Sequence, residues 1–369
     1  MNELLLALKS EDETDRLYAA HDIAKTQDAK AALPLLLCLE KESSQVVKDA
    51  IVSTLKLIPC TSVYDKLFDL FSSPEAFLRN QMVTIFGCEG NDAVPYLTSK
   101  LDHTNQEVRK LILDALFKIG SSDALLAIRA YIHDKSQNVK ITAVEYLGEL
   151  DDKESVPELI SLFKSDSEAM LRSSILDTLS LIGDAQAIKT VVDLIRSGGV
   201  ISAAEMPVYL PHLIDLVCKS GDQDDVIVIL KTVGSDVLFA DDLIAGMLLA
   251  LRRHSTILLD RKICDILLQL LIRDEVRDDV RLMIAEILGN KMHPNVLTSQ
   301  ELYVNGKELL RNPALIIGGL NLLMVCGSEE AYSCIREELY KTNNIELKSL
   351  YEDLLNGTLK KINHTSCSE

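Results

Sequence analysis

Residues 108–120 read Val-Arg-Lys-Leu-Ile-Leu-Asp-Ala-Leu-Phe-Lys-Ile-Gly, and this stretch decides the fold. Its basic residue, Arg109, is followed three and seven positions later by Ile112 and Leu116. Side chains at these spacings share one face of a helix. Gly120 comes eleven positions after Arg109, where a glycine can end the helix. The stretch therefore predicts one amphipathic helix of about three turns.

The same pattern recurs along the chain at a nearly constant spacing. Six basic residues, 30 to 32 positions apart, mark the copies: Arg16, Lys48, Arg79, Arg109, Lys140 and Arg172. Apolar residues recur three and seven positions after each base, and Gly, Pro or a polar residue recurs eleven positions after it. A period of this length predicts stacked helical repeats, in which each unit buries its apolar face against its neighbours.

A second apolar helix follows in each copy, for example over residues 124–133 and 155–163. Pro34, Pro95 and Pro157 lie near the expected starts of such second helices, where a missing N–H costs least. Each repeat is therefore expected to be a pair of helices joined by short turns. The sequence shows no strand pattern.

These residues carry a family resemblance. The stretch 108–120 resembles a HEAT repeat, and residues 139–152 (VKITAVEYLGELDD) resemble the short variant named after phycobilisome lyases, with Lys140 in place of its arginine. The resemblance implies that the helix carrying the base is the inner one and lines the concave side of a superhelix. It implies an architecture and no particular function, because such repeats serve many unrelated roles.

The resemblance is strongest over residues 14–197, blurs through 198–275 and returns at 280–289, which contains Arg281. Later, weaker copies begin at Leu310-Arg311 and Leu347-Lys348. We predict an all-α superhelix of about eleven helix pairs, forming a single solenoid over residues 1–356. Its regular repeats cover 1–197, its irregular repeats 198–275, with helices at about 203–219, 223–233, 237–253 and 258–273, and its last repeats 276–356. Residues 357–369 are expected to be a disordered tail.

Composition excludes several classes of partner. The chain of 369 residues has 38 Lys and Arg against 56 Asp and Glu, a formal net charge of −18, and it has no Trp. This charge argues against nucleic acid and favours a protein partner with a basic or mixed-charge surface. No apolar stretch is long enough to span a bilayer, and the N-terminal residues are expected to form a short helix and not a signal peptide. The eight cysteines, none in a Cys-x-x-Cys pair, are expected to be free and mostly buried in a cytoplasmic protein.

The basic column is expected to be structural. An acid precedes each base by six or seven positions in several copies, as Asp102 precedes Arg109 and Asp134 precedes Lys140. We expect the bases to reach turn carboxylates of their own and a neighbouring repeat, and the acids to cap the next helices. The alternative is a basic stripe that binds phosphate. The expected ladder comprises Lys48, Arg79, Arg109, Lys140, Arg172 and Arg281, with Asp102, Asp134 and Asp166.

A polar column lies five positions after the base. It includes Asp114, Glu145 and Asp177 on three consecutive helices of the inner layer, and these carboxylates are the candidate contacts for a basic partner. The alternative is that they only solvate a surface. The spacing is too wide for one metal ion. His103 and His133 lie beside turn acids in adjacent repeats and are expected to be surface or helix-end residues.

The run Leu243–Leu251 is apolar almost throughout and is expected to form a helix buried on several sides. The alternative is an exposed groove or a dimer surface. The sequence contains none of the common nucleotide-binding, metalloprotease or serine-hydrolase motifs, and no cofactor is expected.

We therefore predict a non-catalytic adaptor or scaffold that binds another protein through its concave or irregular surface. Three alternatives stay open: a subunit like the lyases that attach bilins, a chaperone-like HEAT protein, and a HEAT-like DNA glycosylase. The sequence leaves the oligomeric state open.

Overall fold

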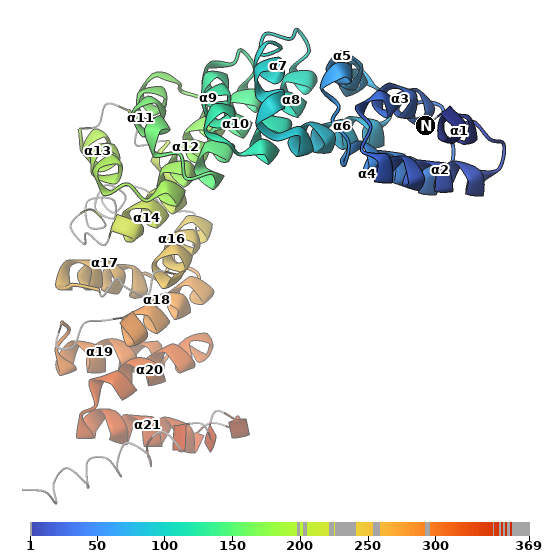
Figure 1. Cartoon of the computed structure of the whole chain (residues 1–369). Coiled ribbons are helices and arrows are strands. Elements are labelled where there is room, and N and C mark those ends of the chain that lie inside the picture. The colour runs from blue at the N-terminus through green and yellow to red at the C-terminus, as the bar shows by residue number, and fades with distance from the viewer. Residues whose placement is uncertain are drawn as a thin grey trace, which may run out of the picture. The chain divides into compact units, whose positions relative to one another are not determined.

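The computed structural model describes residues 2–197, 200–201, 205–220, 225, 241–253, 259–291, 296–341, 343–346, 348–349, 351–352 and 355. Within these ranges the chain consists of α-helices and short 3-10 helices joined by turns, with no β-strand (Figure 1). The prediction of an all-α fold is confirmed. The chain divides into two compact units, residues 1–182 and 183–369.

The first unit contains the regular repeats. Its helices are α1 (Asn2–Ala7), α2 (Glu13–Thr26), α3 (Ala32–Leu39), α4 (Gln45–Leu55), α5 (Tyr64–Asp69), α6 (Ala76–Glu89), α7 (Val94–Thr98), α8 (Gln106–Ile119), α9 (Ser122–Ala130), α10 (Gln137–Glu149), α11 (Val156–Ser165) and α12 (Ala169–Ile182). Helices α2, α4, α6, α8, α10 and α12 carry the basic column and form one layer, here called the inner layer (Figure 1). Helices α3, α5, α7, α9 and α11 form the outer layer.

Apolar side chains hold the two layers together. Ile112 and Leu116 on α8 are fully buried, and the residues at both of these repeat positions are buried in all six copies. Burial of one such side chain contributes about 1.5–3 kcal/mol, so the two columns form the continuous core of this unit. Pro95 and Pro157 lie in the first turns of α7 and α11, as the sequence predicts.

The inner-layer helices end where the sequence places the breaker. In five of six copies the residue eleven positions after the base has a positive φ: Gln27 (51°), Gly90 (64°), Gly120 (61°), Asp151 (51°) and Gly183 (68°). The sixth is Pro59, whose ring fixes a negative φ. A residue with positive φ thus follows most of these helices, even where the sequence offers no glycine, although ψ differs between Gly90 (−142°) and Gly120 (15°).

The second unit contains the less regular copies. Its helices are α13 (Ala185–Arg196), α14 (Met206–Ser220), α16 (Asp241–Arg253), α17 (Arg261–Leu271), α18 (Asp278–Lys291), α19 (Ser299–Leu309), α20 (Ile316–Cys326) and α21 (Glu329–Lys341). Three of the helices predicted for residues 198–275 are present as α14, α16 and α17. The predicted helix 223–233 and the predicted tail 357–369 lie outside the described residues, apart from the helical residue 225. A single stack over residues 1–356 stays a prediction.

One weak copy differs from expectation. Arg311 precedes its helix instead of lying within it, because Pro313 opens a 3-10 turn (Pro313–Leu315) and α20 starts only at Ile316. The Arg311 side chain is 76% exposed and pairs with Glu308. This arginine is therefore outside the basic column.

The apolar run at Leu243–Leu251 lies on α16. Ile244, Leu248 and Leu251 are buried, whereas Leu249 is 44% exposed. The helix therefore buries one apolar face and leaves at least one leucine in solvent.

Helices α19 and α20 approach closely because glycines face each other. A Cβ added to Gly319 would lie 2.7 Å from the carbonyl oxygen of Gly306, and one added to Gly306 would lie 2.9 Å from Cγ of Leu323. Distances this short are not tolerated by carbon, so a side chain at either position would force the helices apart. Gly319 serves this contact, whereas its neighbour Gly318 faces α18, where an added Cβ would lie 3.0 Å from Cβ of Ala285.

No helix among the described residues is long and apolar enough to cross a membrane. Seven cysteines lie in the described part of the chain, and all are free. Cys60, Cys218, Cys264 and Cys326 are buried, and burial raises the pKa of the Cys60 and Cys264 thiols to about 12. Cys88, in contrast to the expectation for most cysteines, is exposed.

Candidate functional site

The basic side chain of the fourth repeat is part of the packing between repeats. Arg109 on α8 is 2% exposed, and its Nε and Nη2 donate to the two carboxylate oxygens of Asp134 at 2.7 and 2.8 Å. Its Nη1 donates to the backbone carbonyls of His103 (2.7 Å) and Thr104 (3.2 Å). A bidentate arginine–carboxylate pair is among the strongest polar contacts in proteins. Arg109 thus joins the turn before its own helix to the turn before the next one.

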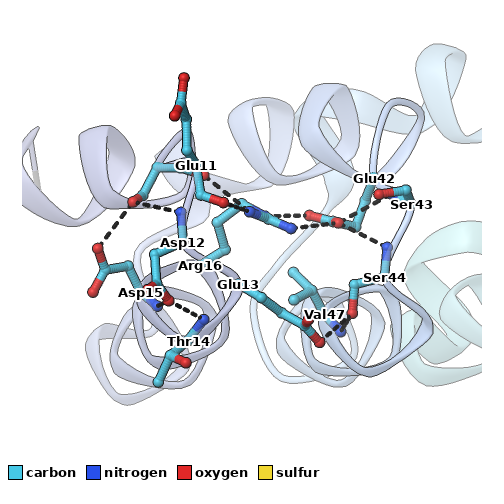
Figure 2. Close-up of polar contacts among 11 residues, drawn as sticks. Glu11, Asp12, Glu13, Thr14, Asp15, Arg16, Glu42, Ser43, Ser44 and Val47 are labelled. Carbon is cyan, nitrogen blue, oxygen red and sulfur yellow. Dashed lines mark hydrogen bonds and ion pairs between the residues drawn. The ribbon is translucent and has the colours of Figure 1, made fainter.

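The same contact recurs along the first unit. Figure 2 shows it for Arg16, whose Nε and Nη2 donate to Glu42 at 2.8 and 3.0 Å. In each pair the acid follows the base by 25 to 27 residues. The four pairs, here called the base–acid ladder, are Arg16–Glu42, Lys48–Glu75 (2.5 Å), Arg109–Asp134 and Lys140–Asp166 (2.9 Å).

Three of the four ladder acids also hold the turn before the next helix. Asp134 accepts the backbone N–H of Ser136 at 2.7 Å, Glu42 accepts that of Ser44 at 2.9 Å and Asp166 that of Glu168 at 3.0 Å. Burial acts to raise the pKa of Asp134, but the hydrogen bonds from Arg109 and Ser136 outweigh it and lower the pKa. The hydrogen bond from Lys140 lowers the pKa of Asp166. These carboxylates are therefore held in the ionised form.

The partner of each base differs in part from expectation. Arg109 pairs with Asp134 and not with Asp102, and Lys140 pairs with Asp166 and not with Asp134. Toward its own turn, an arginine of the column reaches backbone carbonyls instead of carboxylates. Arg281 is the exception, with Asp274 at 3.8 Å and Asp278 at 3.5 Å, both measured from its Nη1. Arg172 donates to the carbonyl of Asp166 at 2.7 Å and lies over the ring of Phe163.

The ladder is interrupted at the third repeat. Arg79 donates to the carbonyls of Ser73 (2.7 Å) and Pro74 (3.1 Å) but makes no ion pair with any described residue. The ladder position 25 to 27 residues later holds Thr104, Asn105 and Gln106. Asp102 is exposed and makes no hydrogen bond or ion pair within the described chain. Arg79 and Asp102 are thus ladder residues by sequence but not by contact.

The acidic column divides into two kinds of residue. Asp114 is half-buried on α8 and accepts a 2.6 Å hydrogen bond from the hydroxyl of Tyr146 on α10. Burial raises the pKa of Asp114, although the Tyr146 hydrogen bond and the charge of Lys110 oppose this. Glu145 and Asp177 are exposed. Of the three candidate contacts, two are therefore exposed, and Asp114 is engaged in packing between repeats.

An aromatic pair lies beside Asp114. The rings of Phe117 and Tyr146 stack across α8 and α10, with centroids 4.1 Å apart and planes inclined by 16°. Both residues are half-buried. Aromatic residues in such positions are typical anchors of protein interfaces. Sequence periodicity did not single out this pair, although Phe117 and Tyr146 stand on adjacent copies.

The two histidines do not meet in a shared site. The ring of His103 lies 5.8 Å from that of Phe68, and Nε2 of His133 lies 2.6 Å from Oε1 of Glu158. Within the part of the chain that the structure describes, no group of His, Cys, Asp and Glu is arranged to hold a metal ion.

Comparison with known proteins identifies the repeat type. Residues 126–206 match the family model described as HEAT repeats, which confirms the repeat predicted from the sequence. No curated protein matches the sequence of this chain.

Several solved structures are similar to it at low identity. The CpcE–CpcF complex of phycocyanin lyase from Nostoc sp. PCC7120 has 18% identity and a TM-score of 0.28, covering 62% of this chain and 92% of that one. A structure described for the interaction between cadherin and beta-catenin has 12% identity and a TM-score of 0.30, covering 90% and 82%. A structure of Kap95p binding to RanGDP has 11% identity and a TM-score of 0.36, covering 92% and 60%. Values this low do not indicate a shared activity or partner.

Proposed function

Because the chain is a HEAT-repeat protein, we propose that it is a non-catalytic scaffold that binds another protein on the exposed face of its inner layer. The observation that carries this proposal is the division of charge on α8, α10 and α12. The ladder bases on α8 and α10 are largely buried and form ion pairs with acids, whereas Glu145 and Asp177 are exposed.

Charge and shape support a basic protein partner. An exposed column of carboxylates on a chain with a net charge of −18 attracts cationic surfaces and repels nucleic acid and anionic lipid. The Phe117–Tyr146 stack supplies apolar area beside Asp114. Stacked helices present such a face repeatedly, which suits an extended or helical segment of another protein.

Site-specific photo-crosslinking in the native cell tests this proposal. A benzoylphenylalanine replaces Lys110, an exposed residue of the inner layer beside Asp114, and in a matched control replaces Lys164, an exposed lysine of the outer helix α11. We expect a discrete protein adduct from position 110 and none from position 164. In lysate, raising the salt concentration, or combining Glu145→Gln with Asp177→Asn, should reduce the adduct. Equal adducts from both positions, or none from position 110, would place the function elsewhere.

A further inference from the structure

A hollow of about 690 Å³ lies in the first unit between the turn that follows α1 and helix α3. Its volume is within the range of about 300–1,000 Å³ that is typical of sites for small molecules. Ten residues line it, and one of its walls is the ladder pair Arg16–Glu42 (Figure 2). We call it the α3 hollow.

The lining of the α3 hollow is positively charged. It contains three bases, Lys9, Arg16 and Lys41, but only one acid, Glu42. The chain as a whole has the opposite balance, with 38 bases against 56 acids. The hollow is therefore a positive site on a strongly negative protein, and such a site attracts anions.

Two of the three bases are available to a ligand. Nε and Nη2 of Arg16 donate to Glu42, and its Nη1 donates to two backbone carbonyls at 3.0 Å, so this pair is neutralised within the protein. Lys9 and Lys41 are exposed, and their ammonium groups make no hydrogen bond or ion pair within the described chain. The positive charge of the hollow is thus that of these two lysines.

Acids of the neighbouring turns do not cancel this charge. Asp15 accepts a hydrogen bond from the hydroxyl of Ser10 at 2.9 Å, and Glu40 pairs with Lys66 at 2.9 Å. The acids that are near in sequence but do not line the hollow are Glu11, Asp12, Glu13, Asp15 and Glu40. The net charge of the lining therefore stays positive.

The rest of the hollow offers apolar contact. Leu8 and Pro34 line it, together with Leu37, a large apolar side chain that is 44% exposed. Cys38 also lines it and is half-buried. Burial raises the pKa of the Cys38 thiol, although the charges of Lys9 and Lys41 oppose this, so the thiol is neutral and adds to the apolar surface.

We propose that the α3 hollow binds a small amphiphilic anion, with a carboxylate or phosphate head between Lys9 and Lys41 and an alkyl or aryl group against Pro34 and Leu37. Lysine ammonium groups form charge-assisted hydrogen bonds with both kinds of head group. This inference goes beyond the scaffold function. It concerns other helices than those of Glu145 and Asp177, and a ligand of the opposite charge.

Alkylation of Cys38 by iodoacetamide in the full-length protein tests this proposal. Mass spectrometry follows Cys38 and, in the same sample, the exposed Cys88, which is not part of the hollow. Hexanoate and hexyl phosphate, at constant ionic strength, should slow the alkylation of Cys38 saturably and leave that of Cys88 unchanged. The stronger of the two identifies the preferred head group. Acetate and inorganic phosphate should protect at least tenfold more weakly, and hexylammonium should not protect.

Substitutions separate the two halves of the site. Lys9→Gln combined with Lys41→Gln should weaken the binding of both hexyl probes about tenfold or more. The matched control, Lys30→Gln, changes an exposed lysine of the same repeat outside the hollow and should leave binding unchanged. Leu37→Ser should remove the advantage of hexanoate over acetate.

Saturation transfer from the protein to the hexyl protons, measured by NMR, gives a second readout that does not depend on the thiol. A lack of transfer to both anionic probes, equal binding of hexylammonium, or full affinity in the double lysine variant would overturn the proposal. None of these results would affect the scaffold proposal, which is tested by the adduct at position 110.

Discussion

The hydroxyl of Tyr146 on α10 donates a 2.6 Å hydrogen bond to Oδ1 of Asp114 on α8. The bond crosses between neighbouring repeats, and the same tyrosine ring stacks on Phe117. A carboxylate that the sequence offers as a contact for a partner is thus also a packing residue. Its two neighbours in the column, Glu145 and Asp177, are exposed.

Asp114→Asn should raise the stability of the protein at pH 7, by no more than about 1 kcal/mol. The amide oxygen can still accept from Tyr146, and the cost of burying a charge disappears. Burial raises the pKa of Asp114 above its unfolded value. The wild-type protein is therefore more stable at low pH, where this carboxyl is neutral, and it loses that stability as the pH rises through the folded pKa. The advantage of the variant should therefore vanish below about pH 4. Urea unfolding at several pH values measures it, and a variant less stable at pH 7 would contradict the assignment.

Arg109→Ala should lower the free energy of unfolding by about 3 kcal/mol, because it leaves the carboxylate of Asp134 buried and unpaired. Arg79→Ala is the matched control. Arg79 occupies the same repeat position and bonds to two carbonyls as Arg109 does, but it has no ladder acid. Its loss should cost about 1 kcal/mol. Thermal or chemical unfolding compares the two, and equal losses would show that the ladder acid contributes nothing.

Gly306→Ala should destabilise the protein by about 2 kcal/mol, since the new methyl group would press on Leu323 and on the backbone of Gly319. Gly289→Ala serves as control. Gly289 lies within α18, and a Cβ there would meet its nearest neighbour, Val325, at 3.9 Å. That substitution should instead stabilise by about 0.5–1 kcal/mol. A harmless Gly306→Ala in chemical unfolding would mean that α19 and α20 do not approach as closely as described.

Gln27→Gly should stabilise the first unit by about 0.5–1 kcal/mol. Gln27 ends α2 with φ 51° and ψ 27°, a left-handed conformation that favours glycine. The reverse change, Gly120→Ala at the same repeat position, should cost about 1 kcal/mol, because no atom lies closer than 3.6 Å to the added Cβ and only the backbone is strained. Differential scanning calorimetry on both variants checks that the two shifts have opposite signs.

Periodicity was sufficient to predict the repeats, because helix faces and helix ends are local properties. Ile112 and Leu116 are buried as their spacing predicts, and Gly120 ends α8. The acid that pairs with Arg109, in contrast, could not be predicted from periodicity. Acids lie both six or seven residues before a base and about 26 residues after it, and only the offset between stacked repeats decides between them. That offset is a three-dimensional quantity that spacing along the chain does not contain.

The exception at Arg79 was nevertheless visible in the sequence. Thr104, Asn105 and Gln106 occupy the ladder position that holds an acid after Arg16, Lys48, Arg109 and Lys140. Once the true offset is known, this gap and the isolation of Asp102 follow from the sequence alone. The α3 hollow does not, because its shape depends on how the turn after α1 packs against α3.

The lack of an ion pair at Arg79 within the described chain has a mechanical consequence. If unit 1 were stretched between its two ends, the joints after Arg16, Lys48, Arg109 and Lys140 would each resist through an ion pair as well as through packed helices. Among the described residues, the joint between α6 and α8 has no such ion pair, and it is held by apolar packing and by the hydrogen bonds of Asn91 with Ser121 and Asp123. It is accordingly the most compliant joint among these repeats, and the first unit should yield there before it yields at the joints that an ion pair reinforces.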